Sequence, residues 1–251
     1  MDYSNLKVEA FTQNLLEYSK ITNEASKSIA NALQPIGLIV LAIFFVVELL
    51  NWKHFLNRNE KKVSTSLLIE FAAKYLIGLV LIALTPAILD SIMDISIRIT
   101  KTINNIYPPS SYAIQYSDAD IDGYFTRNIV NGFGKILSKI TNIVVYALIF
   151  IRYVDLYFLK AFAPIMVGFF YSDTFRPTVM NFFKQFIAYS LLGATLLILS
   201  IIFGKLIESQ LVDSVEAEPL TISLLTITKG VVYLIIIIGS IKKVKSLIGA
   251  N

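Results

Sequence analysis

Five apolar segments separated by polar stretches constrain the fold of this chain more than any other feature. A helix needs about 20 apolar residues to cross the roughly 30 Å hydrocarbon core of a bilayer. Only 16% of the 251 residues are charged and 55% are hydrophobic, whereas soluble domains carry about 25% charged residues. The sequence therefore predicts an all-α, polytopic helical membrane protein with about five transmembrane helices. The predicted spans lie near 33–50, 67–89, 136–160, 182–203 and 220–241.

The charges of the connecting regions predict the orientation. Lysines and arginines collect after the first, third and fifth segments, whereas the other connections, such as 205–219, are rich in acids. Basic regions stay in the cytoplasm. We therefore expect the N-terminus outside and the C-terminus inside. The stretch 95–135, which contains the turn signal YPPSS, is predicted to be an extracytoplasmic loop.

The N-terminal 32 residues form a separate predicted unit before the transmembrane domain of 33–251. Apolar or small side chains recur there every three or four residues, which predicts one amphipathic, extracytoplasmic helix. The pattern favours a helix packed on its own protein, and a membrane-surface or partner-binding helix is the alternative. The stripe consists of Val8, Phe11, Leu15, Tyr18, Ala25, Ile29 and Ala32.

Charged residues and a proline interrupt the stretch RYVDLYFLKAFAPIMVGFF, which begins at Arg152. Arg152 and Asp155 are three residues apart and are predicted to pair on one helix face. Lys160 is expected to extend toward the interface. Pro164 removes a backbone donor, which predicts a turn at AFAP and a short interfacial elbow over 161–178.

A polar hinge, SDTFRPT, continues this elbow. Asp173 and Arg176 are spaced for a second ion pair, and Pro177 follows. The elbow residues suit either a lined pathway or a docking surface, but their spacing alone favours an ordinary connector between two spans.

Two further groups of charges lie at the second segment. Glu70 and Lys74 are spaced as a favourable pair within one helix. Asp90 and Asp94 follow the apolar residues and are expected only to solvate a helix end.

The motif DADIDG provides the one candidate metal site. Asp118, Asp120 and Asp122 match the first half of a calcium loop, but Ile129 occupies the position of the required glutamate. This favours a solvated acidic turn over a calcium site.

No cofactor and no catalytic activity are expected. The chain has no cysteine and a single histidine, His54. This excludes thiolate chemistry and histidine-rich metal sites, and no G-x-S-x-G or P-loop motif is present.

The chain resembles the TrbL-like polytopic inner-membrane subunits of type IV secretion (conjugal transfer) systems. The resemblance rests on FIRYVDLYFLKAFAPIMVGFF and SDTFRPTVMNFFKQFIAYSLLGATLLIL, with GLIVLAIFFVVELLNW and LLIEFAAKYLIGLVLIAL in the first two segments. It covers most of residues 33–203. It implies a channel or scaffold subunit in a bacterial cytoplasmic membrane that helps to translocate a DNA–protein substrate.

The resemblance also implies partners. These are other membrane subunits, further copies of this chain and a cytoplasmic ATPase. The ATPase is expected to dock at the polar regions 51–66, 171–178 and 242–251. Basic loops suggest transient contact with transferred DNA. A small autonomous transporter or permease subunit is the alternative. Charges are absent from the centres of the first and fourth segments, which favours the secretion subunit, because transporters place ionisable groups at mid-membrane.

Overall fold

The computed structural model describes residues 9–59, 65–107, 124–210 and 219–250, and its regular secondary structure is entirely helical there. The predicted all-α class is thus confirmed. The helices are α1 (Glu9–Thr12), α2 (Leu15–Tyr18), α3 (Lys20–Asn59), α4 (Thr65–Ile106), α5 (Tyr124–Phe169), α6 (Arg176–Gln210), α7 (Pro219–Ile238) and α8 (Ser240–Ile248).

Four helices, α3 to α6, are long and apolar enough to cross a membrane. In α7, the apolar run among the residues described in full is shorter, Ile227–Ile238. This composition and length fit a polytopic membrane protein of the helical class.

The long helices extend well beyond the predicted spans. With 46 residues, α5 is about 69 Å long at 1.5 Å per residue. The predicted loop 95–135 is therefore helical at both ends, because α4 continues to Ile106 and α5 begins at Tyr124. The last turns of α4 bury Ser96, Ile97 and Thr100, and packing of this kind stabilises helical turns beyond the apolar part.

The N-terminal unit is not one helix, and this corrects the prediction for 1–32. Asn14 has extended backbone (φ −82°, ψ 175°), and its side chain accepts a hydrogen bond from the Glu17 amide. The Glu17 carboxylate accepts one from the Asn14 amide in return, so a capping box restarts the helix here. After a second break at Ser19, α3 runs without interruption into the first apolar segment.

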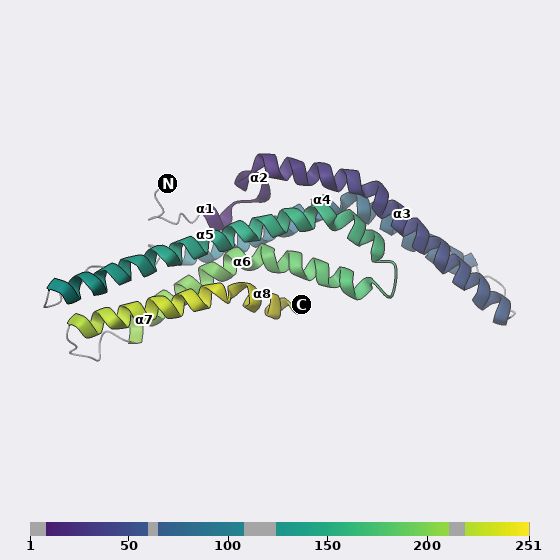
Figure 1. The fold of residues 1–251 in the computed structure, drawn as a ribbon. Helices are drawn as coiled ribbons and strands as arrows, with labels where there is room; N and C mark the ends of the chain where they lie inside the picture. The colour runs from purple at the N-terminus through teal and green to yellow at the C-terminus, as the bar shows by residue number, and fades with distance from the viewer. Residues whose placement is uncertain (1–8, 60–64, 108–123, 211–218, 251) are drawn as a thin grey trace.

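The helices form an elongated assembly (Figure 1). α5 lies at its centre and packs against α3, α4, α6 and α7. The hairpin of α3 and α4 extends past the turn that joins α5 to α6. α8 follows α7 and packs on α6.

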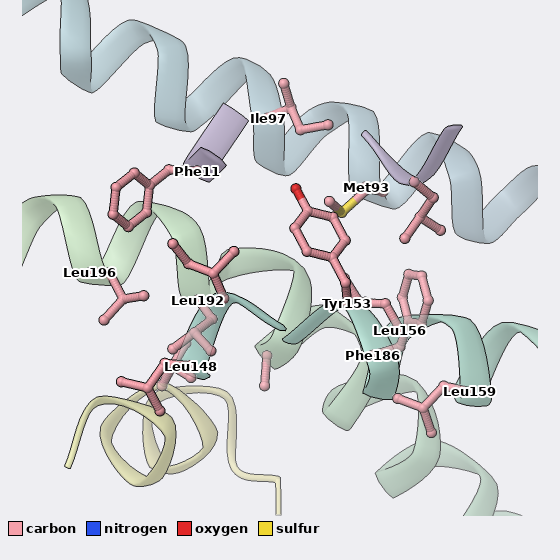
Figure 2. Packing of buried hydrophobic residues seen from close by; sticks show 14 of the residues in the cluster. Phe11, Met93, Ile97, Leu148, Tyr153, Leu156, Leu159, Phe186, Leu192 and Leu196 are labelled. Carbon is pink, nitrogen blue, oxygen red and sulfur yellow. The ribbon is translucent and has the colours of Figure 1, made fainter. Parts of the chain in front are cut away.

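The main apolar core lies around the middle of α5 (Figure 2). α5 contributes Leu148, Tyr153 and Leu156, and α6 contributes Phe186 and Leu192. A second, smaller cluster joins α3 and α4 to the C-terminal end of α5. It consists of Leu41, Tyr75, Ile82, Val167 and Tyr171.

Pro164 does not end its helix, so the turn predicted at 161–164 is wrong. α5 continues to Phe169, bends near its C-terminal end (Figure 1), and the chain reverses over 170–175. Tight packing holds the helix there. A Cβ on Gly37 would lie 2.4 Å from the Pro164 carbonyl oxygen, and one on Gly168 would lie 2.5 Å from the Gly37 oxygen. α3 and α5 thus meet backbone to backbone, as small residues permit between membrane helices.

Candidate functional site

The N-terminal strap, residues 9–19, is the irregular element inserted among the long helices. Its helix α1 contacts α4 and α6, and α2 contacts α3 and α5. Phe11 and Leu15 are buried in the main core. Irregular backbone is stable inside a membrane protein only where protein groups satisfy its polar atoms. The side chains that do so come mainly from one stretch of α5.

Arg152 is a fully buried charged group of this stretch, with an exposed fraction of 0%. Its Nε donates to the Tyr189 carbonyl at 3.0 Å, and its Nη2 donates to the Ser190 carbonyl at 3.0 Å. Nη1 donates to the Phe11 carbonyl of the strap at 3.3 Å. The Met93 sulfur lies 3.8 Å from Nη2. One guanidinium therefore connects the strap, α4, α5 and α6.

The charge of Arg152 is balanced by dipoles instead of a carboxylate. Among the described residues, no acid forms an ion pair with it. Phe11 lies in the last turn of α1, where carbonyls lack helical partners and carry partial negative charge. The predicted Arg152–Asp155 pair is therefore not formed, and Asp155 lies against the Tyr189 side chain. Backbone carbonyls from distant parts of the sequence therefore take the place of Asp155 as partners of Arg152.

Gly193 leaves the space that Arg152 occupies. A Cβ at this position would lie 2.6 Å from Nη1 of Arg152 and 2.9 Å from the Phe11 oxygen. Any side chain on α6 here would displace either the guanidinium or the strap.

Two tyrosines on α5 continue the contacts along the strap. Tyr153 donates to the Gln13 carbonyl at 2.7 Å, and Tyr157 donates to the Leu15 carbonyl at 2.5 Å. The Tyr18 ring stacks on Tyr153 with centroids 3.7 Å apart. Burial raises the pKa of the Tyr18 phenol, which keeps it neutral. Strap carbonyls on both sides of the Asn14 break thus have donors from α5.

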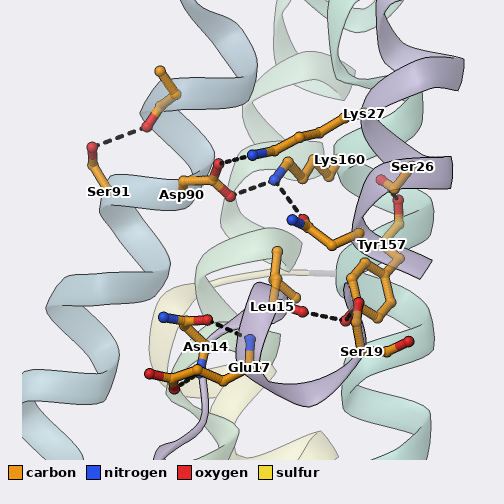
Figure 3. A network of polar contacts seen from close by, with 12 residues as sticks. Asn14, Leu15, Glu17, Ser19, Ser26, Lys27, Asp90, Ser91, Tyr157 and Lys160 are labelled. Carbon is orange, nitrogen blue, oxygen red and sulfur yellow. Dashed lines mark hydrogen bonds and ion pairs between the residues drawn. The ribbon is translucent and has the colours of Figure 1, made fainter. Parts of the chain in front are cut away.

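An ionic cluster lies next to the strap and joins three helices (Figure 3). Lys160 of α5 has an exposed fraction of 0% and donates to Asp90 of α4. It also donates to Asn23 of α3 at 3.1 Å. Lys27 of α3 lies 3.7 Å from the other Asp90 oxygen, and the Asp90 side chain is 37% exposed. Two cations therefore share one carboxylate.

This cluster corrects two predictions. Lys160 does not extend toward water, because Asp90 and Asn23 hold its ammonium inside the bundle. Asp90 does not solvate a helix end, because α4 continues for four more turns and the carboxylate faces Lys160.

A second ionic group joins α3 and α4 in the hairpin. Lys74 donates to both oxygens of Glu48 at 2.8 Å, and the Tyr75 hydroxyl donates to Glu48 at 2.6 Å. Lys74 is thus paired across helices and not with Glu70, which is exposed. The half-buried Glu48 of α3 therefore takes the place of Glu70, the partner predicted for Lys74 within α4.

The predicted Asp173–Arg176 pair is confirmed at 3.1 Å. It lies in the turn before α6, and Arg176 also lies 5.7 Å from the Phe170 ring centroid. Pro177 occupies the first turn of α6, where an amide donor is not needed. The elbow residues therefore divide into two places, with Arg152 and Lys160 in the bundle interior and Asp173 to Pro177 at the turn.

The calcium candidates Asp118, Asp120 and Asp122 lie outside the described residues. Within the described ranges, no group of three or more His, Asp or Glu residues could hold a metal ion.

The sequence reasoning missed Tyr153, Tyr157 and Asn23. One signal was available, because Arg152, Tyr153, Tyr157 and Lys160 put hydroxyls and cations on one side of a predicted span. Polar groups inside a membrane segment mark functional contacts, but the strap that they bind could not be inferred from their spacing.

Searches of protein-family models, curated proteins and solved structures find no match to the chain.

Proposed function

We propose that the chain is a TrbL-like channel or scaffold subunit of a type IV secretion (conjugation) machine in a bacterial cytoplasmic membrane. There it contributes to translocation of a DNA–protein substrate. The observation that carries the proposal is the position of the segment on which the resemblance rests. Its arginine and lysine lie at the centre of the helical assembly, where they join the strap, α3, α4 and α6.

That position supports a scaffold role. The polar groups of the segment connect several long helices to one another. They also connect these helices to the N-terminal strap. A subunit of this kind transmits movement of one element to the others. It uses no chemistry of its own and depends on an ATPase partner for energy.

The proposal includes five spans with the N-terminus outside and the C-terminus in the cytoplasm. α7 then provides the fifth span, and the turn of residues 170–175 between α5 and α6 lies at the cytoplasmic interface. The polar regions 51–66, 171–178 and 242–251 lie on the cytoplasmic side, where an ATPase docks. Other secretion subunits and further copies of the chain cover the apolar surfaces not in contact with lipid, and transferred DNA contacts the basic loops only transiently.

Deletion and complementation test this function. In the native host, loss of the gene should abolish conjugative transfer, and the wild-type gene should restore it. Gly193→Leu should insert into the membrane but fail to restore transfer, because a side chain there displaces Arg152 or the strap. Gly204→Leu, where a Cβ meets nothing within 4 Å, is the matched control and should restore transfer. Crosslinking in cells followed by native electrophoresis should give a large complex.

A small autonomous transporter is the second candidate, and the Lys27–Asp90–Lys160 cluster favours it. Ionisable residues inside a bundle often bind substrate or relay protons. A solitary monomer after crosslinking, together with normal transfer in the deletion strain, would overturn the secretion proposal and support the transporter.

A further inference from the structure

The short helix α8 has one face on the protein and one basic face that the protein leaves open. Val244 and Ser240 are buried, and α8 packs along α6. Lys242 and Lys243 are exposed on the other side, and neither forms an ion pair among the described residues.

Polar contacts fix α8 in place and orient this face. Lys184 of α6 donates to the Gly249 carbonyl at 3.2 Å, and Gly249 ends α8 in the left-handed conformation with φ 65°. The Lys245 ammonium lies 4.8 Å from the Tyr189 ring centroid. Two of the four lysines at this place are thus engaged by the protein, and Lys242 and Lys243 remain for a ligand.

The open lysines lie where an apolar helix surface ends. Ile235 and Ile238 of α7 are exposed, and Lys242 follows within about one helical turn. Such a change from exposed isoleucine to lysine matches the boundary between the hydrocarbon core and the headgroups of a bilayer. Lys184 and Lys245 add positive charge next to these lysines, and Asp155 lies beside Tyr189.

We propose that Lys242 and Lys243 bind the phosphate headgroup of an anionic phospholipid at the membrane surface next to α8. The charge of the face, its exposure and its position after an apolar helix all fit this ligand. The inference needs only a membrane-embedded chain and does not depend on the secretion function.

Native mass spectrometry of the full chain in mild detergent tests the inference. Phosphatidylglycerol is titrated against phosphatidylcholine, and the retained lipid adducts are counted. The test variant is Lys242→Gln/Lys243→Gln. The matched control is Lys101→Gln/Lys139→Gln, which removes two exposed lysines from α4 and α5. Circular dichroism checks that both variants remain helical.

The wild-type chain should retain phosphatidylglycerol in preference to phosphatidylcholine. The test variant should need about fivefold more phosphatidylglycerol for each lysine removed, the factor that corresponds to roughly 1 kcal/mol per lysine at a membrane surface. The control should behave like the wild type. A photoreactive phosphatidylglycerol should label peptides of α8.

Equal retention of both lipids, or an unchanged titration in the test variant, would overturn the inference. Saturation by free inorganic phosphate without lipid would also overturn it. In each of these cases the lysine face would belong to a protein, a nucleic acid or a soluble anion.

Discussion

Arg152 shows how this chain keeps a cation inside an apolar bundle. Removing a charge from water costs several kcal/mol even after relaxation, and here three carbonyls oppose that cost. The planar guanidinium suits the task, because its donors diverge and reach α1 and α6 together, whereas an ammonium is a single compact point. The same residue therefore holds the strap and joins it to α6.

Arg152→Ala should lower the stability of the chain by about 3 kcal/mol, because carbonyls lose their donors and a cavity remains. Arg152→Lys should recover only part of this loss. Thermal unfolding in detergent, followed by circular dichroism, measures both. The control is Arg98→Ala, which truncates an exposed arginine on α4. Indistinguishable melting of the alanine variants at 152 and 98 would show that the guanidinium contributes nothing.

Asp90→Asn should destabilise the chain more than Lys27→Ala does. The first change leaves the buried Lys160 without its counter-ion, a situation that costs about 3–5 kcal/mol for buried pairs, whereas Lys27 is half exposed. Lys160→Met in the Asp90→Asn background should recover stability, because the unpaired charge is gone. The same melting experiment decides. A double variant less stable than Asp90→Asn alone would argue against a stabilising ion pair.

The helices themselves were largely predictable, but their partners were not. Apolar segments of sufficient length predicted the long helices of the described chain. Proline removes one backbone hydrogen bond, so the sequence predicts a helix end at Pro164. That loss is outweighed by a contact with Gly37, more than a hundred residues earlier in the chain. A contact between distant helices likewise decides the partner of Lys74, which bonds to Glu48 of α3 and not to Glu70. Local spacing contains no information about which distant helix approaches.

Gly37→Val should separate α3 from α5, because its side chain would collide with the Pro164 carbonyl. We expect a lower melting temperature and faster proteolysis near this crossing. Gly204→Val is the matched control, since a Cβ there meets nothing within 4 Å. The packing account predicts a clear difference between the two variants. Similar losses in both would reduce the effect to the general cost of valine in a helix.

The molecule as a whole is longer than a bilayer is thick. α5 is about twice as long as the roughly 30 Å hydrocarbon core, so parts of the long helices lie outside it. The α3–α4 hairpin nevertheless exposes many apolar side chains along its length, which require lipid or protein around them. They include Ile39, Ile43, Val46, Val47, Ile69, Leu76, Ile77 and Val80.

The proposed five-span orientation predicts which positions face outward. The chain contains no cysteine, so any thiol labelling of a single-cysteine variant comes from the introduced cysteine. Ser4→Cys, Gln115→Cys and Val212→Cys should react with an impermeant thiol reagent in intact cells. Asn59→Cys and Leu247→Cys should react only after permeabilisation. Labelling at 59 in intact cells would contradict the orientation but not the helical fold.

The central claim is that the N-terminal strap is an interior element of the bundle, held there by Arg152. Hydrogen–deuterium exchange of the full chain in detergent tests it most directly. Peptides covering residues 9–19 should exchange slowly in the wild-type chain. In Arg152→Ala they should exchange at rates close to those of an unstructured segment, while peptides from the middle of α6 stay protected. A wild-type strap that exchanges as fast as an unstructured segment would contradict the claim.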